Sequence, residues 1–152
     1  MKIELEPVGY VRGGRTEAID DDWGDVKAAI EIDRRFPQDA IAGLESFSHL
    51  VVVYYFHRVD PSTIEVVARH PRENPAWPKV GIFSQRGKNR PNLLGVSTCR
   101  IIGVQGLRIH VQGLDAIDGT PVLDLKPHMT GFEPRGQVRE PEWAREVMGK
   151  YW

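Results

Sequence analysis

Short runs of alternating apolar and polar residues recur along the chain, while helical patterns are sparse. A period of two is the pattern of β-strands with one buried face. Such runs end at residues 30–32 and recur at 107–112 and 121–126. Because strands and helices do not alternate regularly, a doubly wound parallel sheet is disfavoured. The sequence therefore predicts a mainly β, single-domain, barrel-like fold, with a sandwich as the neighbouring alternative.

Two longer strands are predicted in the middle of the chain. The stretch HLVVVYYF at 49–56 is apolar at both parities, which is typical of a central strand covered on both faces. Residues 95–104 predict a second strand, bent or bulged at Gly103. Gln105 and Gly106 then supply a two-residue turn into the run at 107–112, so these strands are expected to form a hairpin.

Helices are expected in only two places. Residues 38–44 follow a proline and end near a glycine, and Pro141 opens a C-terminal helix over 141–149. A proline-rich connection at 60–79 is expected to contain one short strand at 64–67, and loops of this length are often functional. The 152 residues suit one domain. Its core is expected at about 5–130 and a tail at 131–152.

Composition excludes several classes of protein. The lone Cys99 permits neither an internal disulfide nor a cysteine zinc cluster, and the five histidines lack zinc-binding spacing, so no metal is expected. The chain has no apolar run of about 18 residues and no secretory signal pattern, so cytoplasmic localisation without membrane contact is predicted. Nucleotide-binding glycine motifs and a Gly-x-Ser-x-Gly elbow are also absent.

Charge is balanced overall but unevenly distributed. A net charge of −1 gives no general attraction to nucleic acid, so any RNA contact must be local. Residues 17–25 carry five acidic side chains, whereas the loop at 85–90 holds Arg86, Lys88 and Arg90. Both segments are compatible with solvated loops. The guanidinium groups also suit carboxylate or phosphate oxygens.

Two further segments carry polar groups that suit a ligand. His57 and Arg58 follow the strand at 49–56, where a histidine is either a hydrogen-bonded structural residue or a ligand contact. Asp118 and Gly119 form a strong turn signal in the segment 113–127. This signal predicts either a hairpin turn or a loop whose backbone and carboxylates hold a ribose, an amino group or a sulfonium.

Taken in order, these segments resemble the TsaA-like (TrmO, YaeB) family, whose best characterised branch methylates N6-threonylcarbamoyladenosine in tRNA. The resemblance is carried by PVGYVR at 7–12, EID at 31–33, GLESFSHL at 43–50, RPN at 90–92 and DGTP at 118–121. It extends over nearly the whole chain to Pro127. The family implies a β-barrel-like fold that binds S-adenosylmethionine near a homodimer interface.

The resemblance also implies a cofactor pocket. Its positions in this sequence are His57, Arg58, Arg86, Leu94, Asp115, Ala116, Ile117, Asp118, Gly119 and Thr120. Arginine suits the carboxylate of the methionine moiety, and aspartate suits its amino group or the ribose hydroxyls. Transfer to N6 requires loss of a proton, and His57 and Asp118 are the candidate catalytic bases.

The sequence departs from the family in two loops. Residues 85–95 (QRGKNRPNLLG) replace a TRSPxRPNPIG-type loop, and residues 15–24 replace a PRQ-type segment. Within the second, Trp23 is a candidate to stack on a base. Together with Arg86, Lys88 and Arg90, it forms the predicted RNA-contact set.

The tRNA enzymes of the family continue into a further C-terminal region. Two alternatives to tRNA methylation therefore remain: methylation of a small-molecule acceptor, and a non-catalytic β-barrel that binds RNA or S-adenosylmethionine. The aromatic residues Trp143, Tyr151 and Trp152 suit either a dimer interface or core packing.

Overall fold

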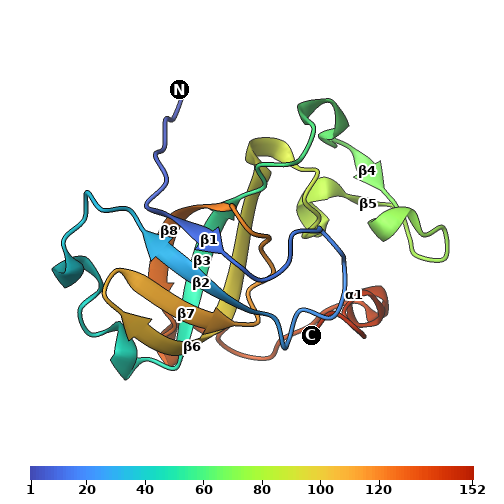
Figure 1. Cartoon of the computed structure of the whole chain (residues 1–152). Helices are drawn as coiled ribbons and strands as arrows, with labels where there is room; N and C mark the ends of the chain where they lie inside the picture. Colours follow the sequence, from blue (N-terminus) through green and yellow to red (C-terminus); the bar gives the residue numbers. More distant parts are fainter.

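Six antiparallel strands close into a barrel in the computed structural model, which describes residues 1–152 (Figure 1). Around the barrel the order is β1-β2-β7-β6-β3-β8. The strands are β1 (Gly9–Arg12), β2 (Lys27–Ile32), β3 (His49–Tyr55), β6 (Leu94–Gln105), β7 (Arg108–Gln112) and β8 (Pro121–Pro127). The predicted mainly β, barrel-like fold is confirmed.

The barrel interior is filled by aliphatic side chains from alternate strand positions. Val11, Ile30, Leu50, Ile109 and Val122 are all fully buried. Branched side chains suit the pleated surface of a strand, which explains why these short runs form a closed sheet. Burial alternates along β3, so only its inward face is fully covered. The expectation that both faces of this strand are covered is wrong, because no second layer encloses the barrel.

The hairpin between β6 and β7 forms as predicted. The pairing register shifts between Ile101 and Gly103, which confirms the bulge expected at that glycine. The turn itself lies at Gly106 and Leu107, and Gly106 has a φ of 59°. A glycine adopts this left-handed conformation at little cost, so the hairpin closes tightly.

Helical segments are short, and most are single 3-10 turns. The helix expected at 38–44 is split into η1 (Gln38–Ile41) and η2 (Leu44–Ser46), which flank Gly43. The C-terminal helix α1 spans Glu142–Val147, inside the predicted range. The remaining turns are η3 (Pro61–Thr63), η4 (Pro71–Glu73), η5 (Ile82–Ser84), η6 (Pro91–Leu93) and η7 (Thr130–Phe132). None of the helices is long and apolar enough to cross a membrane.

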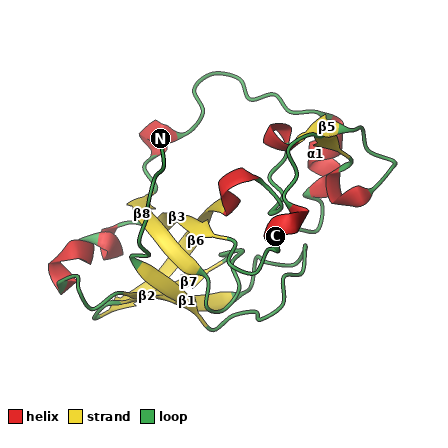
Figure 2. Ribbon diagram, turned by 90° about the horizontal axis from the view of Figure 1, so that it is seen from above, coloured by secondary structure: helices red, strands yellow, loops and turns green.

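The connection between β3 and β6 forms an excursion to one side of the barrel. It contains a small hairpin of β4 (Ala68–Arg69) and β5 (Val80–Gly81), so the strand expected at 64–67 lies a few residues later. Figure 2 shows β5 beside α1. A hydrogen bond of 2.7 Å from the Trp77 indole to Glu146 joins the two segments. The C-terminal part of the chain is therefore attached to this excursion.

The segment 113–120 crosses one end of the barrel. It joins β7 to β8, which are not neighbours in the sheet. The hairpin interpretation of Asp118 and Gly119 is therefore wrong: their turn belongs to a crossing loop. Leu114 and Ala116 point into the core from this loop. Hydrogen bonds that join Val11 to Gly119 and Thr120 fix its far end.

Candidate functional site

The end of β3 and the crossing loop bring two of the predicted residues together. A methyl group built at Gly119 would lie 3.8 Å from Nε2 of His57, so the loop backbone passes close to the imidazole. Gly119 has a φ of 80°, a conformation that favours glycine. The imidazole and the Asp118–Gly119 peptide therefore face a common space at this end of the barrel.

Asp118 is held by backbone groups on both sides. Its Oδ1 accepts a hydrogen bond from the Gly13 N–H at 2.8 Å, and its own N–H donates to the Arg15 carbonyl at 2.7 Å. The other carboxylate oxygen, Oδ2, makes no hydrogen bond within the chain. Asp118 is thus oriented by the chain and retains an acceptor for a ligand.

His57 is a half-buried histidine beside a permanent cation. Burial lowers its pKa, and the Arg58 guanidinium lowers it further, against a smaller opposing effect of the Tyr55 backbone. Arg58 itself is exposed and donates to the Thr16 carbonyl at 3.1 Å. A histidine with a lowered pKa is neutral at neutral pH and can accept a proton.

Asp115 differs from Asp118 because both of its carboxylate oxygens accept hydrogen bonds from tyrosine hydroxyls. Tyr54 donates to Oδ1 at 3.0 Å and to the Asp115 carbonyl at 3.1 Å. Tyr151, from the C-terminal segment, donates to Oδ2. Burial and the Asp115 charge raise the pKa of both phenols, while nearby Arg86 opposes this increase. This cluster joins β3, the crossing loop and the C-terminal segment.

The predicted basic loop is largely engaged with its own backbone. Arg90 donates to the carbonyls of Gln85 at 2.8 Å and Gly87 at 3.4 Å, so it shapes the loop. Arg86 is exposed and donates to the Val96 carbonyl at 2.7 Å. Lys88 is exposed and has no partner. Arg90 is therefore a structural residue, whereas Arg86 and Lys88 are accessible to a ligand.

The remaining predicted pocket residues present mainly backbone. Ala116, Ile117 and Thr120 are buried, so their side chains pack inward from the crossing loop. Leu94 is half-buried at the start of β6, opposite Tyr55 of β3. A ligand over the crossing loop would meet peptide groups of these residues and the side chain of Asp118.

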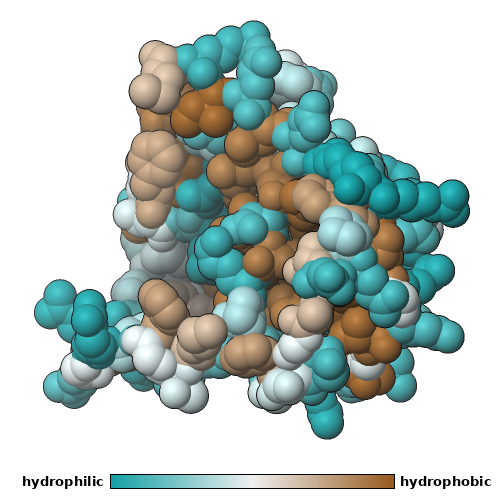
Figure 3. Space-filling view, turned by 90° about the vertical axis from the view of Figure 1, so that its left-hand side faces the viewer, coloured by the Kyte–Doolittle hydropathy of each residue, from teal (hydrophilic) through white to brown (hydrophobic).

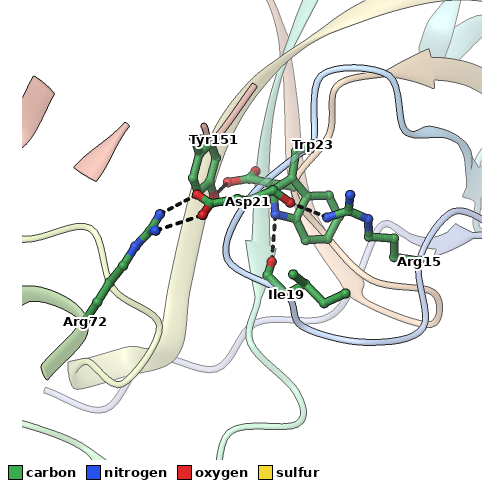
Figure 4. Close-up of polar contacts among 7 residues, drawn as sticks. Arg15, Ile19, Asp21, Trp23, Arg72 and Tyr151 are labelled. Atoms are coloured by element: carbon green, nitrogen blue, oxygen red, sulfur yellow. Dashed lines mark hydrogen bonds and ion pairs between the residues drawn. The ribbon is translucent and has the colours of Figure 1, made fainter. Parts of the chain in front are cut away.

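Trp23 is a structural residue of the acidic segment, which corrects its predicted role as a stacking platform. Only 3% of its surface is exposed. Its indole N–H donates to the Ile19 carbonyl at 2.9 Å, and the Arg15 guanidinium lies 4.6 Å from the ring centroid (Figure 4). A base therefore has no free face of this ring on which to stack.

The acidic segment is also tied to the excursion between β3 and β6. Arg72 makes two hydrogen bonds to the Asp21 carboxylate, at 2.9 and 3.1 Å (Figure 4). Arg15 donates to the carbonyls of Asp21 and Asp22. The segment is consequently ordered by cations from two other parts of the chain. Its charge does not make it a loosely solvated loop.

Two cavities lie away from the predicted pocket residues. One, of about 370 Å³, is lined mainly by apolar residues in and around η1, η2 and β8, including Phe36, Ile41 and Phe47. Figure 3 looks onto this side of the molecule, where apolar side chains gather. The other, of about 410 Å³, is a shallow basic hollow that includes Arg12, Lys27 and Arg108. No three His, Cys, Asp or Glu residues are grouped so as to hold a metal ion.

Several residues at this end of the barrel escaped the sequence prediction. Tyr54 lies in a strand that the sequence predicts, at a position that points into the barrel. Nothing in the sequence near it indicates that its hydroxyl bonds to Asp115, 61 residues away. For Tyr151 the sequence indicates only an aromatic residue of the C-terminal tail. The pairing of Arg72 with Asp21 spans 51 residues and has no local signal. Only the fold brings these groups together.

A family model, curated relatives and solved structures all match this chain to the same family. A model described as the tRNA-methyltransferase O N-terminal domain matches residues 21–133. The human tRNA (adenine(37)-N6)-methyltransferase is 36% identical over 118 residues, which cover 76% of this chain and 26% of that protein. The chain therefore spans about a quarter of the human protein.

A second relative matches along nearly its full length. This protein of Methanothermobacter thermautotrophicus, named a probable S-adenosyl-L-methionine-binding protein, is 36% identical over 142 residues. The match covers 90% of this chain and 97% of that protein. A crystal structure of TrmO from Pseudomonas aeruginosa superposes with a TM-score of 0.73 and 28% identity, covering 91% of this chain and 62% of that one.

Proposed function

The chain belongs to the tRNA-methyltransferase O N-terminal domain family, and we propose that it is an S-adenosylmethionine-dependent methyltransferase acting on tRNA. The observation that carries the proposal is the family match, which spans His57, Arg86 and the whole crossing loop 113–120. The relatives named for tRNA methylation and for S-adenosylmethionine binding support the substrate and the cofactor. The proposed acceptor is N6 of adenosine, in its N6-threonylcarbamoyl form.

The groups at the barrel end fit this cofactor chemically. Asp118 keeps one carboxylate oxygen free for an ammonium group or a ribose hydroxyl. Arg58 and Arg86 offer exposed guanidinium groups for a carboxylate. Gly119 leaves space beside the His57 imidazole that a side chain would narrow. A cation, a free carboxylate oxygen and open backbone are the partners that an amino-acid nucleoside requires.

The chemical role of the chain is to orient the acceptor and to take up a proton. S-adenosylmethionine, when bound, supplies an electrophilic methyl group. The chain must hold the accepting nitrogen in line at about 3 Å and exclude water. Buried residues of the crossing loop close the floor beneath this position. Hydrogen bonds of Gly119 and Thr120 to Val11 of the closed barrel hold the loop in this position.

Removal of the proton from the accepting nitrogen is assigned to His57. Its lowered pKa keeps Nε2 available as an acceptor at neutral pH. Asp118 is the second candidate, and its free Oδ2 suits either proton acceptance or stabilisation of the imidazolium after transfer. Substitution of either residue is expected to reduce turnover more than the affinity for tRNA.

We also propose that the chain acts as a single-domain unit that forms a homodimer in the cytoplasm. Exposed apolar side chains on the excursion support a dimer surface, since Val66, Val67 and Phe83 are 71, 61 and 78% exposed. The buried free thiol of Cys99 and a tRNA substrate support the cytoplasm.

Calorimetric titration with S-adenosylmethionine tests the cofactor proposal. The wild-type protein is expected to bind. Asp118→Asn and Arg86→Ala are each expected to weaken binding by about tenfold, because each removes a charged hydrogen-bond partner. Asp39→Asn is the matched control, since Asp39 is exposed on η1 and lies outside the predicted set. A folded wild-type protein that does not bind, or equal affinities in all four proteins, would contradict the proposed site.

A further inference from the structure

The outer face formed by β1, β2, β7 and β6 carries a shallow basic hollow that we propose is the binding surface for the phosphodiester backbone of the RNA substrate. The inference rests on the proposed function and adds the location of the substrate backbone. The cations of this face come from four strands and lie far apart in the sequence; they are Arg12, Lys27, Arg100 and Arg108. Only the pairing register brings them onto one face.

Ala29 lines the hollow and lies in a row of paired residues across the sheet that ends at Gly103. Arg12 pairs with Ala29, Ala29 pairs with His110, and His110 pairs with Gly103. Because neighbouring strands lie about 4.8 Å apart, this row places a methyl group and a bare backbone between longer side chains. A Cβ at Gly103 would meet nothing within 4 Å. The result is the hollow of about 410 Å³.

Cations form both walls of the hollow. On one side the wall is Lys27, which pairs with Gln112; Gln112 pairs in turn with Arg100, which lies on the same face beside the hollow. On the other side Arg108 pairs with Glu31. Lys27 and Arg100 are exposed and form no ion pair, so their charges are available to a ligand.

Acidic side chains neutralise this face only in part. Glu31 lies 3.8 Å from Arg12 and 3.8 Å from Arg108, beyond hydrogen-bond distance, and all three side chains are 42 to 50% exposed. Asp25 accepts a long hydrogen bond of 3.4 Å from Gln112 at the edge. Four cations therefore outnumber two carboxylates on one face of a chain whose net charge is −1.

Gly13 connects the hollow to the candidate site. Gly13 lines the hollow, and its N–H donates to Asp118 at 2.8 Å. Arg12, the preceding residue, lies over the Tyr10 ring at 5.3 Å, which orients its guanidinium along the face. A nucleic acid strand on this face therefore reaches the crossing loop directly.

The shape and charge of the hollow favour a polyanionic chain over a compact ligand. The cations of this face are spread across four strands, and the hollow is open to solvent. Phosphate contacts of this kind position a nucleic acid and carry no sequence information. The face is therefore expected to supply affinity, with base selection left to the site beside His57.

The test compares two double variants with the same change in charge. Lys27→Glu/Arg100→Glu alters one cation that lines the hollow and one beside it on the same face, whereas Arg135→Glu/Arg139→Glu alters exposed arginines of the segment 131–140. The probe is a fluorescently labelled tRNA transcript, and affinity is measured by anisotropy over a series of salt concentrations. Thermal melting checks folding, and Arg108→Glu provides an independent test of the opposite wall.

The hollow variant is expected to bind tRNA at least about tenfold more weakly than wild type, and its salt dependence on a log–log plot is expected to fall by about 1.5 for two lost phosphate contacts. Arg108→Glu is expected to weaken binding as well, while Arg135→Glu/Arg139→Glu binds nearly as wild type. Unchanged affinity in the two hollow variants, with clear binding by wild type, would overturn this inference alone. If wild type does not bind tRNA, both the inference and the proposed tRNA substrate are overturned. The proposed binding of S-adenosylmethionine is tested separately by the calorimetric titration.

An anionic membrane is the competing occupant of a basic face. Sedimentation with phosphatidylserine vesicles distinguishes it. Vesicle binding that is lost in Lys27→Glu/Arg100→Glu, with tRNA affinity unchanged, would assign the face to lipid and contradict the inference.

Discussion

The Gly13 N–H donates a hydrogen bond of 2.8 Å to Oδ1 of Asp118 and so joins the end of β1 to the loop that crosses the barrel. This contact leaves Oδ2 free while fixing the orientation of the carboxylate. It also connects the basic hollow, which Gly13 lines, to the space beside His57. The proposed RNA-binding face and the proposed site of chemistry thus share the backbone of Gly13.

Gly119→Ala is expected to impair cofactor binding through a defined steric effect. Gly119 and Gly43 have φ values of 80° and 89°, so alanine at either position is expected to cost about 1 kcal/mol of stability. Only at Gly119 would the added methyl lie near His57 Nε2, at 3.8 Å. Calorimetry should show weaker S-adenosylmethionine binding for Gly119→Ala and wild-type affinity for Gly43→Ala. Equal affinities of Gly119→Ala and Gly43→Ala for S-adenosylmethionine would show that the cofactor does not use the space beside His57.

The Asp21–Arg72 ion pair is expected to stabilise the fold measurably. Both side chains are mostly buried, at 30 and 26% exposure, and two hydrogen bonds join them. Asp21→Asn should lower the free energy of unfolding by about 1–2 kcal/mol in urea titrations. The control is Glu140→Gln, because its pair with Arg145 is 50 and 70% exposed and is expected to contribute less than about 0.5 kcal/mol. A similar loss in both variants would contradict the structural role of the Asp21 contact.

Trp23→Phe is expected to destabilise the protein without weakening RNA binding. The substitution removes the hydrogen bond of 2.9 Å to the Ile19 carbonyl and part of a buried ring. The expected loss is about 2 kcal/mol in the free energy of unfolding. Anisotropy with labelled tRNA should give the wild-type affinity for the folded variant. A large loss of affinity would restore Trp23 as a stacking residue.

The fold was predictable from sequence because strand patterns are local. Alternation gave the inward faces of β2 and β7, and Gly103 marked a bulge that the register confirms. In β8 a register shift places Val122 and Leu125 on the same inward face, which strict alternation does not predict. The coverage of β3 was not predictable, since an apolar strand does not reveal whether a second layer lies above its outer face. The same limit affected Asp118 and Gly119, whose turn chemistry suits both a hairpin and a crossing loop.

The site was predictable only where a family resemblance supplied positions. The fold places the Gly119 backbone close to His57, which leaves their role in a cofactor pocket a prediction, whereas Trp23 and Arg90 proved to be structural. Burial and backbone hydrogen bonds decide those two roles, and neither is visible in residue type. The cations of the hollow were missed for a related reason, because strand register alone places Lys27 near Arg100.

Tyr54 and Tyr151 are expected to lower stability at alkaline pH. Burial and the Asp115 charge raise the pKa of both phenols. The folded state therefore keeps them neutral after the unfolded chain begins to ionise near about pH 10. The stability linked to these groups is fully present below that pH and is lost as pH rises above it. Urea unfolding at a series of alkaline pH values should show this decline, and Tyr151→Phe should reduce it. An unchanged decline in Tyr151→Phe would contradict the hydroxyl–carboxylate contact.

The most direct test of the proposed function is transfer of a radiolabelled methyl group from S-adenosylmethionine to tRNA. The assay compares N6-threonylcarbamoylated tRNA with the unmodified transcript, for wild type and for His57→Ala, over a range of pH. We expect methylated N6-threonylcarbamoyladenosine from wild type, a loss of rate on the acid side that reflects the lowered pKa of His57, and at least about a hundredfold lower turnover for His57→Ala. Transfer by His57→Ala at the wild-type rate would remove the histidine from the mechanism. No transfer to either tRNA by a wild-type protein that binds both ligands would contradict the proposed activity.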